Sequence, residues 1–473
     1  MCTDDSPSSG SFVPATAVDP DPPAPYAPKT SRDIYRAIWR MGYPSMIGFG
    51  AVNLYTIADM YWVSRIGPDA VAALTIFSAF YWVISSMNMI AGTGSVAIIS
   101  RRFGEHDIPK TEVAIAEAFF LKIVLAAAFS VVGFLLTPWI MKLLGAREQI
   151  LDYSIGYGRI MFLGLVFNFP CWTVYTALRG IGQPRYAMIL MIASTVLNAV
   201  LDPFFIFPLG GYGLGLGVDG AAWASLVGFA ITIIASLVMF FAGAFRVRLS
   251  WSTLRRAHVS TMWQMLRIGI PAGIGSISFS LGRMAIMPMI ASLGAPVIAV
   301  YGAGARVIEL GILMVVGLEM GMSPLIGHAL GARNKALAWL TARKAVGMGT
   351  LVTIIGGTAI FLLAGSLTRV FFSGPPYEEL GLTFFRIHAF ILPFVGLFIM
   401  FEGAFTGAGD TVPPMVIGMI HSWVILIPVI WLFAFPLALG PTGVWCAFGI
   451  ADGVSAMIFA WWFSKRRWLD RQV

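Results

Sequence analysis

The sequence contains few charged residues and few cysteines. Only 11% of its 473 residues are Asp, Glu, Lys or Arg, whereas soluble globular chains contain about 25%. This composition excludes an ordinary soluble domain. The three cysteines, Cys2, Cys171 and Cys446, are scattered along the chain, so their spacing indicates neither a disulfide framework nor a metal site.

The first 30 residues lack the apolar core of a cleavable signal peptide. They are rich in Pro, Ser and Asp, and we expect residues 1–30 to form a disordered cytoplasmic tail.

Catalytic motifs are also missing. The sequence contains neither H-E-x-x-H nor G-x-S-x-G, so we expect no enzyme activity and no cofactor. The segment GLGVDG, Gly215 to Gly220, matches G-x-G-x-x-G formally, but it follows an apolar helix rather than a strand and does not indicate a nucleotide site. Nothing resembles a basic groove with stacking aromatics, so nucleic acid is not an expected partner.

Long apolar runs dominate what is present. Hydrophobic residues make up 58% of the chain and the mean hydropathy is +0.82. About 20 residues are needed to cross a bilayer, and backbone groups in lipid must be paired internally, which favours helices. The sequence therefore predicts an all-α membrane protein with twelve transmembrane helices, at 42–65, 72–99, 113–138, 151–178, 186–208, 219–243, 265–292, 297–329, 340–365, 379–405, 413–436 and 442–464.

Basic residues predict the orientation, because cytoplasmic connections retain Lys and Arg. Counting alternate connections as inside assigns 22 of the 31 Lys and Arg residues to one side, including Arg179 and Arg185 after the fourth helix. The outer connections hold only Arg65, Lys142, Arg147 and Arg369. We expect a multi-pass protein of the cell (inner) membrane with both termini in the cytoplasm, and its net charge of +8 reflects this asymmetry.

The two halves of the sequence repeat each other. Seven Gly or Pro positions recur after 227 residues: Gly42/Gly269, Pro44/Pro271, Gly67/Gly294, Gly94/Gly321, Gly104/Gly331, Gly180/Gly407 and Gly182/Gly409. Six helices are an even number, so the repeats predict two six-helix bundles related by a pseudo-two-fold axis along the membrane normal, with the substrate site between them. We expect an N-terminal lobe at 31–243, a basic cytoplasmic linker at 244–262 and a C-terminal lobe at 263–473.

Two acids lie inside predicted spans of the first half. Asp59 is 19 residues beyond Arg40, and Asp202 is 17 residues beyond Arg185; at about 1.5 Å per residue, both reach a similar depth. Asn198 is one turn before Asp202 and shares its helix face. The positions 227 residues later are Ile286, Ile425 and Val429, so this polar set exists in one lobe only. Acids in a membrane are costly and are candidates for function; the alternative is that they only tie helices together.

Three stretches resemble the multidrug and toxic compound extrusion (MATE) transporters: GYPSM…IADMYWVSRIGPDAVAAL, ALRGIGQPRYAM…LNAVLDPFFIFPLG…GVDGAAWAS and GIPAG…GARVIE…LIGHALGARN. Within that family the chain is more similar to the DNA-damage-inducible F and archaeal branch. The resemblance implies a V-shaped pair of bundles that exports organic, often cationic, small molecules by antiport with H⁺ or Na⁺. It implies no other cofactor, a bilayer environment and a monomer.

The same resemblance assigns roles to individual residues. It implies that the cation-binding and coupling site comprises Tyr55, Asp59, Asn198, Asp202 and Ser225, with Na⁺ at Asp59, Asn198 and Asp202 if Na⁺ is the coupling ion. Pro44 matches a proline at which the first helix is thought to bend. The residues alone equally allow Pro44 to lie in the first turn of its helix, where a missing N–H costs nothing.

Other interpretations stay open from the sequence. A flippase for lipids or lipid-linked oligosaccharides would share the two-lobe plan, but would require several basic residues in its cleft. The acids Glu309, Glu319, Glu402 and Asp452 have no assigned role; charge pairing is the simplest account, and Glu309 is three residues from Arg306. His388 and His421 are candidates for proton relay or for ordinary helix hydrogen bonds. The sequence leaves the substrates and the choice between H⁺ and Na⁺ open.

Overall fold

The computed structural model describes residues 28, 30–372 and 374–471. The predicted tail, residues 1–30, therefore lies outside the described residues except at positions 28 and 30. The described residues form helices and no strands, which confirms the predicted all-α fold. The helices are α1 (Ser31–Ser64), α2 (Pro68–Gly104), α3 (Ile108–Leu143), α4 (Glu148–Gly180), α5 (Pro184–Ile206), α6 (Val218–Ala242), α7 (Trp251–Arg255), α8 (Val259–Ala291), α9 (Ala295–Gly331), α10 (Lys335–Phe371), α11 (Pro375–Ala408), α12 (Val412–Met419), α13 (Ile427–Ala434) and α14 (Gly440–Ser464).

Short polar signals set the helix ends. Thr30 and Asp33 form a reciprocal capping box at the start of α1. Asp107 caps α3 by accepting a hydrogen bond from the N–H of Lys110, and Asn334 caps α10 in the same way from Leu337. Asp107 and Asn334 are 227 positions apart, so the internal repeat extends to the caps.

The long helices are membrane-spanning in character. By length and composition, ten helical stretches of the described chain are apolar enough to cross a bilayer, and α1 and α2, with 34 and 37 residues, run beside them. Most extend past their predicted spans at one or both ends; α1, for example, begins at Ser31 rather than at residue 42.

The predicted eleventh helix, 413–436, is not uniform. It contains α12, then a π-helical segment η2 (Ile420–Leu426), then α13. Pro428 lies in the first turn of α13. Proline has no N–H for the carbonyl four residues earlier and its ring crowds that carbonyl, which explains a change of hydrogen-bond pattern just before it.

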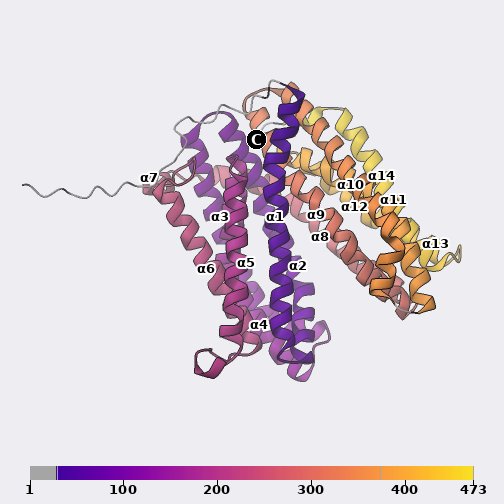
Figure 1. The fold of residues 1–473 in the computed structure, drawn as a ribbon. Coiled ribbons are helices and arrows are strands. Elements are labelled where there is room, and N and C mark those ends of the chain that lie inside the picture. The colour runs from indigo at the N-terminus through magenta and orange to yellow at the C-terminus, as the bar shows by residue number, and fades with distance from the viewer. Residues whose placement is uncertain (1–27, 29, 373, 472–473) are drawn as a thin grey trace, which may run out of the picture.

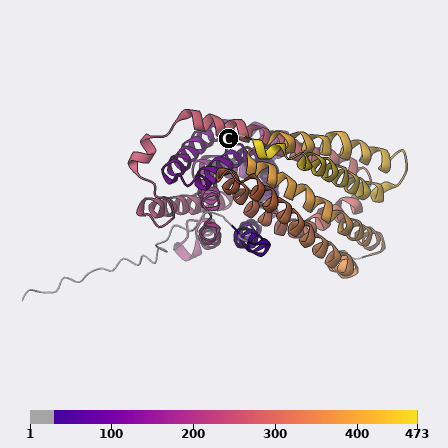
Figure 2. The same cartoon turned by 90° about the horizontal axis from the view of Figure 1, so that it is seen from above.

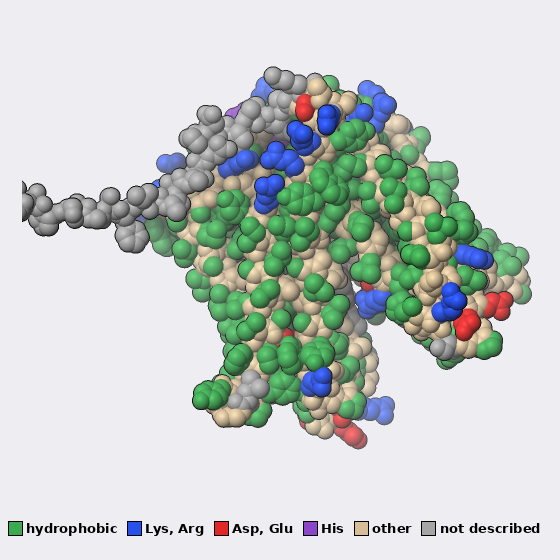
Figure 3. All heavy atoms as spheres, in the orientation of Figure 1, with side chains coloured by type: hydrophobic (Ala, Val, Ile, Leu, Met, Phe, Trp, Pro, Cys, Tyr) green, Lys and Arg blue, Asp and Glu red, His purple; other side chains and the backbone are tan. Residues whose placement is uncertain are grey.

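The helices form two lobes. Figures 1 and 2 show α1–α6 grouped in one bundle and α8–α14 in the other. Contacts between the bundles join α1 to α9, and α2 to both α8 and α9. The lobes meet at the end of the molecule that carries the last described residues and diverge toward the other end, where the space-filling view shows a gap between them (Figure 3).

Glycines allow the close contact between the lobes. A Cβ atom on Gly104 in α2 would clash with the backbone of His328 in α9, and one on Gly331 in α9 would clash with the carbonyl of Arg101 in α2. These are repeat-related contacts, because Arg101 and His328 are also 227 positions apart. His328 adds a hydrogen bond across the contact, from Nε2 to the carbonyl of Gly180 at 2.6 Å. We call this region, around Gly104, Gly331 and His328, the closed seam.

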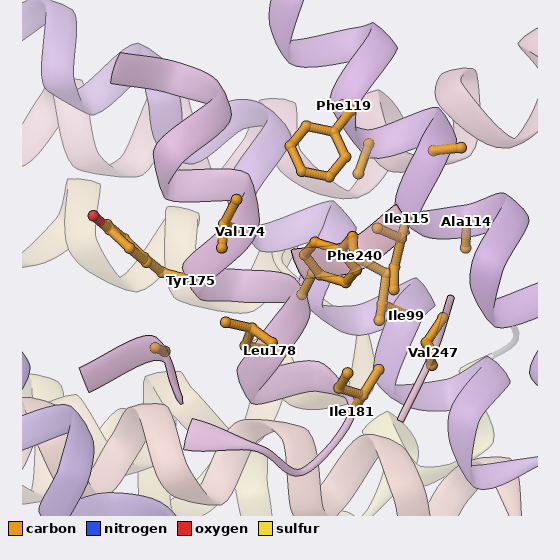
Figure 4. Close-up of a cluster of buried hydrophobic side chains, with 14 of the residues drawn as sticks. Ile99, Ala114, Ile115, Phe119, Val174, Tyr175, Leu178, Ile181, Phe240 and Val247 are labelled. Carbon is orange, nitrogen blue, oxygen red and sulfur yellow. The ribbon is translucent and has the colours of Figure 1, made fainter. Parts of the chain in front are cut away.

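The segment between the lobes packs on the first bundle. Val247 is fully buried among side chains of α2, α3, α4 and α6, including Ile99, Ile115 and Phe240 (Figure 4). The backbone N–H groups of Arg246 and Arg248 donate to the side chains of Gln183 and Glu112. The linker is therefore held against the N-terminal bundle before α8 begins.

Candidate functional site

Asp59 and Asp202 are both buried in the N-terminal lobe. Asp59 lies on α1 with 7% of its surface exposed, and Asp202 lies on α5 with none exposed. The two helices pack side by side, and the carboxylates are close enough to repel each other when both are ionised. A neutralising cation or proton would remove that repulsion.

Four of the five predicted site residues form one hydrogen-bonded chain. The hydroxyl groups of Tyr55 and Ser225 are 2.7 Å apart. Asn198 donates from Nδ2 to Ser225 Oγ at 3.2 Å and to Asp202 Oδ1 at 3.1 Å. This series of hydrogen bonds therefore joins α1, α6 and α5. It orients the Asn198 amide so that its nitrogen points toward Ser225 and Asp202.

Asp59, the fifth residue, is held by a side chain of α4, a contact that the sequence did not indicate. Tyr157 on α4 donates its hydroxyl to Asp59 Oδ2 at 3.4 Å. Tyr157 is buried, and its ring lies edge-on to Phe77 with centroids 5.2 Å apart. No charge or motif marks Tyr157 in the sequence, since an isolated tyrosine in an apolar helix is ordinary membrane composition; only the fold brings it to Asp59.

Three oxygens of this set lack a hydrogen-bond partner among the described residues: Asp59 Oδ1, Asn198 Oδ1 and Asp202 Oδ2. A buried polar atom without a partner is costly. Two carboxylate oxygens and one amide oxygen are ligands that suit a hard cation such as Na⁺, and a carboxyl oxygen also accepts a proton. The described residues contain no group of three or more His, Cys, Asp or Glu suited to a metal.

The corresponding positions of the C-terminal lobe are apolar. Ile286 is fully buried on α8, and Ile425 and Val429 pack against the same core. The lobes thus share a backbone plan while only the first contains the polar set.

Pro44 lies inside α1, 13 residues after its first residue. The alternative that placed it in the first turn of a helix is therefore wrong. An internal proline removes the hydrogen bond to the carbonyl of Arg40, yet α1 continues unbroken through it. The predicted bend at Pro44 stays a prediction.

The acids of the C-terminal lobe have different surroundings. Glu309 pairs with Arg306 at 3.1 Å, as its spacing predicted, and lies 3.7 Å from Arg283. Asp452 lies 3.7 Å from Nδ1 of His421. His388 instead bonds the carbonyl of Phe384, one turn earlier, at 2.9 Å, which is the ordinary helix interaction.

Arg179 departs from the sequence prediction. It was assigned to a connection after the fourth helix, but α4 extends to Gly180 and Arg179 is only 4% exposed. Its guanidinium lies 5.9 Å from the ring centre of Phe49 and it attracts Glu319 of the other lobe. Lys122 on α3 is also buried, at 1% exposure. Glu319, which is half-buried, in turn interacts electrostatically with the half-buried Glu402, so two acids of the second lobe lie near the buried Arg179 of the first.

Comparisons with known proteins agree with this architecture. A family model described as MatE matches residues 44–204 and 271–432, one segment in each lobe. The probable multidrug resistance protein YpnP of Bacillus subtilis is 25% identical over 445 residues, covering 93% of this chain and 97% of that protein. A protein named FAD transporter from Shewanella oneidensis is 26% identical over 416 residues, covering 84% and 88%. A crystal structure of MATE in the bent conformation has a TM-score of 0.85 at 24% identity, covering 93% and 96% of the two chains.

Proposed function

Since the chain belongs to the MatE family of membrane transporters, we propose that it exports organic small molecules, many of them cationic, by antiport with H⁺ or Na⁺. The observation that carries the coupling proposal is the buried pair Asp59 and Asp202 with its three unpaired oxygens. A charged group inside a membrane protein is energetically unfavourable. Such a group is expected where it has a function, and the alternate binding and release of a cation is such a function.

The proposed cycle uses the two lobes as the moving parts. The structure is closed at the seam and open at the opposite end (Figure 3). We assign the seam to the cytoplasmic side of the inner membrane; the Lys and Arg side chains at this end (Figure 3) support the assignment, which would put both termini in the cytoplasm. The arrangement then represents a state open to the outside, and rocking of one repeat against the other would expose the cleft to the cytoplasm.

Coupling requires that the cation and the drug favour different states. When neither carboxylate is neutralised, repulsion between Asp59 and Asp202 favours an arrangement that separates α1 from α5. Cation binding between Asp59, Asn198 and Asp202 lets the two helices pack together, which closes the space available to a drug. A ligand shifts such an equilibrium only through its different affinities for the two states.

A flippase is the second candidate, and the arrangement of charge disfavours it. A lipid-linked substrate with phosphates calls for several free cations in the cleft, whereas Arg179 and Lys122 are buried. The Shewanella relative is nevertheless named an FAD transporter, so FAD, an anionic compound, belongs among the substrates to test.

Measurement of gradient-driven export from proteoliposomes tests the proposal. Purified protein would be reconstituted with an internal fluorescent cation, and Na⁺ and pH gradients would be imposed separately. We expect one inward cation gradient to drive export and an ionophore that dissipates it to stop export. Export that is unaffected by either gradient would contradict antiport.

A further inference from the structure

A pocket of about 340 Å³ lies at the seam end of the N-terminal lobe, away from the acid pair. Its basic residues are Arg102 at the end of α2, Lys110 at the start of α3, and Arg256 and His258 between α7 and α8. Because α2 ends at Gly104, α3 begins at Ile108 and α8 begins at Val259, the pocket lies at the level where helices leave the membrane.

Two of the three Lys and Arg side chains that line the pocket are paired with acids. Lys110 Nζ pairs with Asp107 at 2.7 Å, and Arg102 lies 3.4 Å from Glu105. Glu117, the acid in the pocket wall, accepts a 2.7 Å hydrogen bond from the backbone N–H of His258. Arg256 is exposed and has no ion pair or side-chain hydrogen bond with any described residue. An anion in the pocket would therefore meet one guanidinium without an acidic partner, that of Arg256, beside two cations that are already paired with acids, Arg102 and Lys110.

The other wall of the pocket is apolar and continues along the outside of the helix. Pro109, Val113 and Ala114 line the pocket. From Val113 the same face of α3 presents Phe120, Val124 and Val131 to the surroundings, 39%, 65% and 60% exposed. The spacing of seven and four residues places these side chains in one stripe. A ligand with a phosphate and hydrocarbon chains matches both parts.

We propose that this pocket binds the headgroup of an anionic phospholipid, with the phosphate at Arg102, Lys110 and Arg256 and the acyl chains along the stripe of α3. Basic pockets at the cytoplasmic ends of transmembrane helices suit such headgroups electrostatically. A free phosphate would use the cations and leave the apolar stripe unused.

The position of the pocket gives the lipid a conformational effect. Arg256 and His258 precede α8, the first long helix of the second lobe, and Thr261 of α8 also lines the pocket. Arg102 and Lys110 belong to the first lobe. One bound lipid would therefore contact both lobes at the seam end and stabilise the closed seam relative to states in which α8 moves away.

The test compares two double variants of the full chain in a neutral detergent. Arg102→Gln/Arg256→Gln removes two cations from the pocket, whereas Arg255→Gln/Arg343→Gln removes two exposed cations that do not line it. Dioctanoyl phosphatidylglycerol would be titrated and bound lipid measured by native mass spectrometry. At about fivefold per basic side chain, we expect binding about 25-fold weaker in the pocket variant and nearly unchanged in the control.

The single variant Arg256→Gln is tested as well, in case the double variant misfolds. The Arg256 side chain is exposed and unpaired, so its replacement should not disturb folding, and we expect about fivefold weaker binding. Equal weakening by the pocket and control variants would show diffuse surface attraction and overturn the proposal. So would equal binding of dioctanoyl phosphatidylcholine, or inorganic phosphate that displaces the lipid at equal concentration.

Discussion

The hydroxyl of Tyr157 donates a 3.4 Å hydrogen bond to Oδ2 of Asp59 and so joins α4 to α1. The other oxygen of Asp59 has no partner among the described residues. Tyr157 thereby holds one oxygen of the carboxylate and leaves the other without a partner among the described residues.

The variant Tyr157→Phe removes this donor while keeping the ring against Phe77. A hydrogen bond to a charged group contributes about 1.5–3 kcal/mol, and we expect drug export at a fixed cation gradient to fall roughly tenfold. The measurement is the initial export rate in proteoliposomes, normalised to reconstituted protein. Tyr153→Phe is the matched control, since its hydroxyl accepts a hydrogen bond from Gln149 near the start of α4; a similar loss in both variants would refute the positioning role.

Replacing either acid should abolish coupling without unfolding the protein. Asp59→Asn and Asp202→Asn keep the side-chain size and hydrogen-bonding capacity but remove the charge that a cation neutralises. We expect gradient-driven export to fall to the level of protein-free liposomes, with normal amounts of protein in the membrane. Glu309→Gln, which breaks a pair with Arg306 at the surface of the other lobe, should retain export. Wild-type export by both Asp variants would show that neither acid is required for coupling.

The seam should open when its glycine contacts are blocked. In Gly331→Leu the new side chain meets the backbone of Arg101 in the other lobe, whereas Gly347→Leu on α10 enters open space. A cysteine at Ser95, which is buried beside Met265 of α8, reports access from the seam side in a background without native cysteines. We expect maleimide labelling to be at least about tenfold faster with Gly331→Leu, equivalent to about 1.4 kcal/mol. Unchanged labelling would mean that the contact does not hold the seam closed.

The fold was predictable because its signals are local and repeated. Apolar runs predicted the long helices, and the 227-residue repeat of glycines predicted two similar bundles. Helix ends were less predictable: α1 begins at Ser31 because Thr30 caps it outside the apolar run, and α4 carries the charged Arg179 in its last turn. Hydropathy predicts only the part of a helix that lies in lipid. It does not predict helical turns that continue beyond the bilayer.

The site was predictable only in part. Asp59 and Asp202 stand out because acids are rare in apolar runs, and helix periodicity places Asn198 beside Asp202. Tyr157 comes from a helix whose rotation about its axis depends on tertiary packing, so no spacing along the chain connects it to Asp59. The charges around Arg179 and Glu319 likewise become neighbours only when the lobes meet.

Cation and drug should compete through Asp59 and Asp202, and equilibrium binding of a fluorescent organic cation to the purified protein measures this competition. The titration would be repeated over series of pH and Na⁺ concentration, with Asp202→Asn alongside. Linkage requires that drug lower the affinity for the coupling ion by the same factor by which the ion lowers the affinity for drug. We expect drug affinity to fall as H⁺ or Na⁺ rises in the wild type and to be insensitive to both in Asp202→Asn. Wild-type affinity that is flat across both series would show that neither ion competes with drug at Asp59 and Asp202.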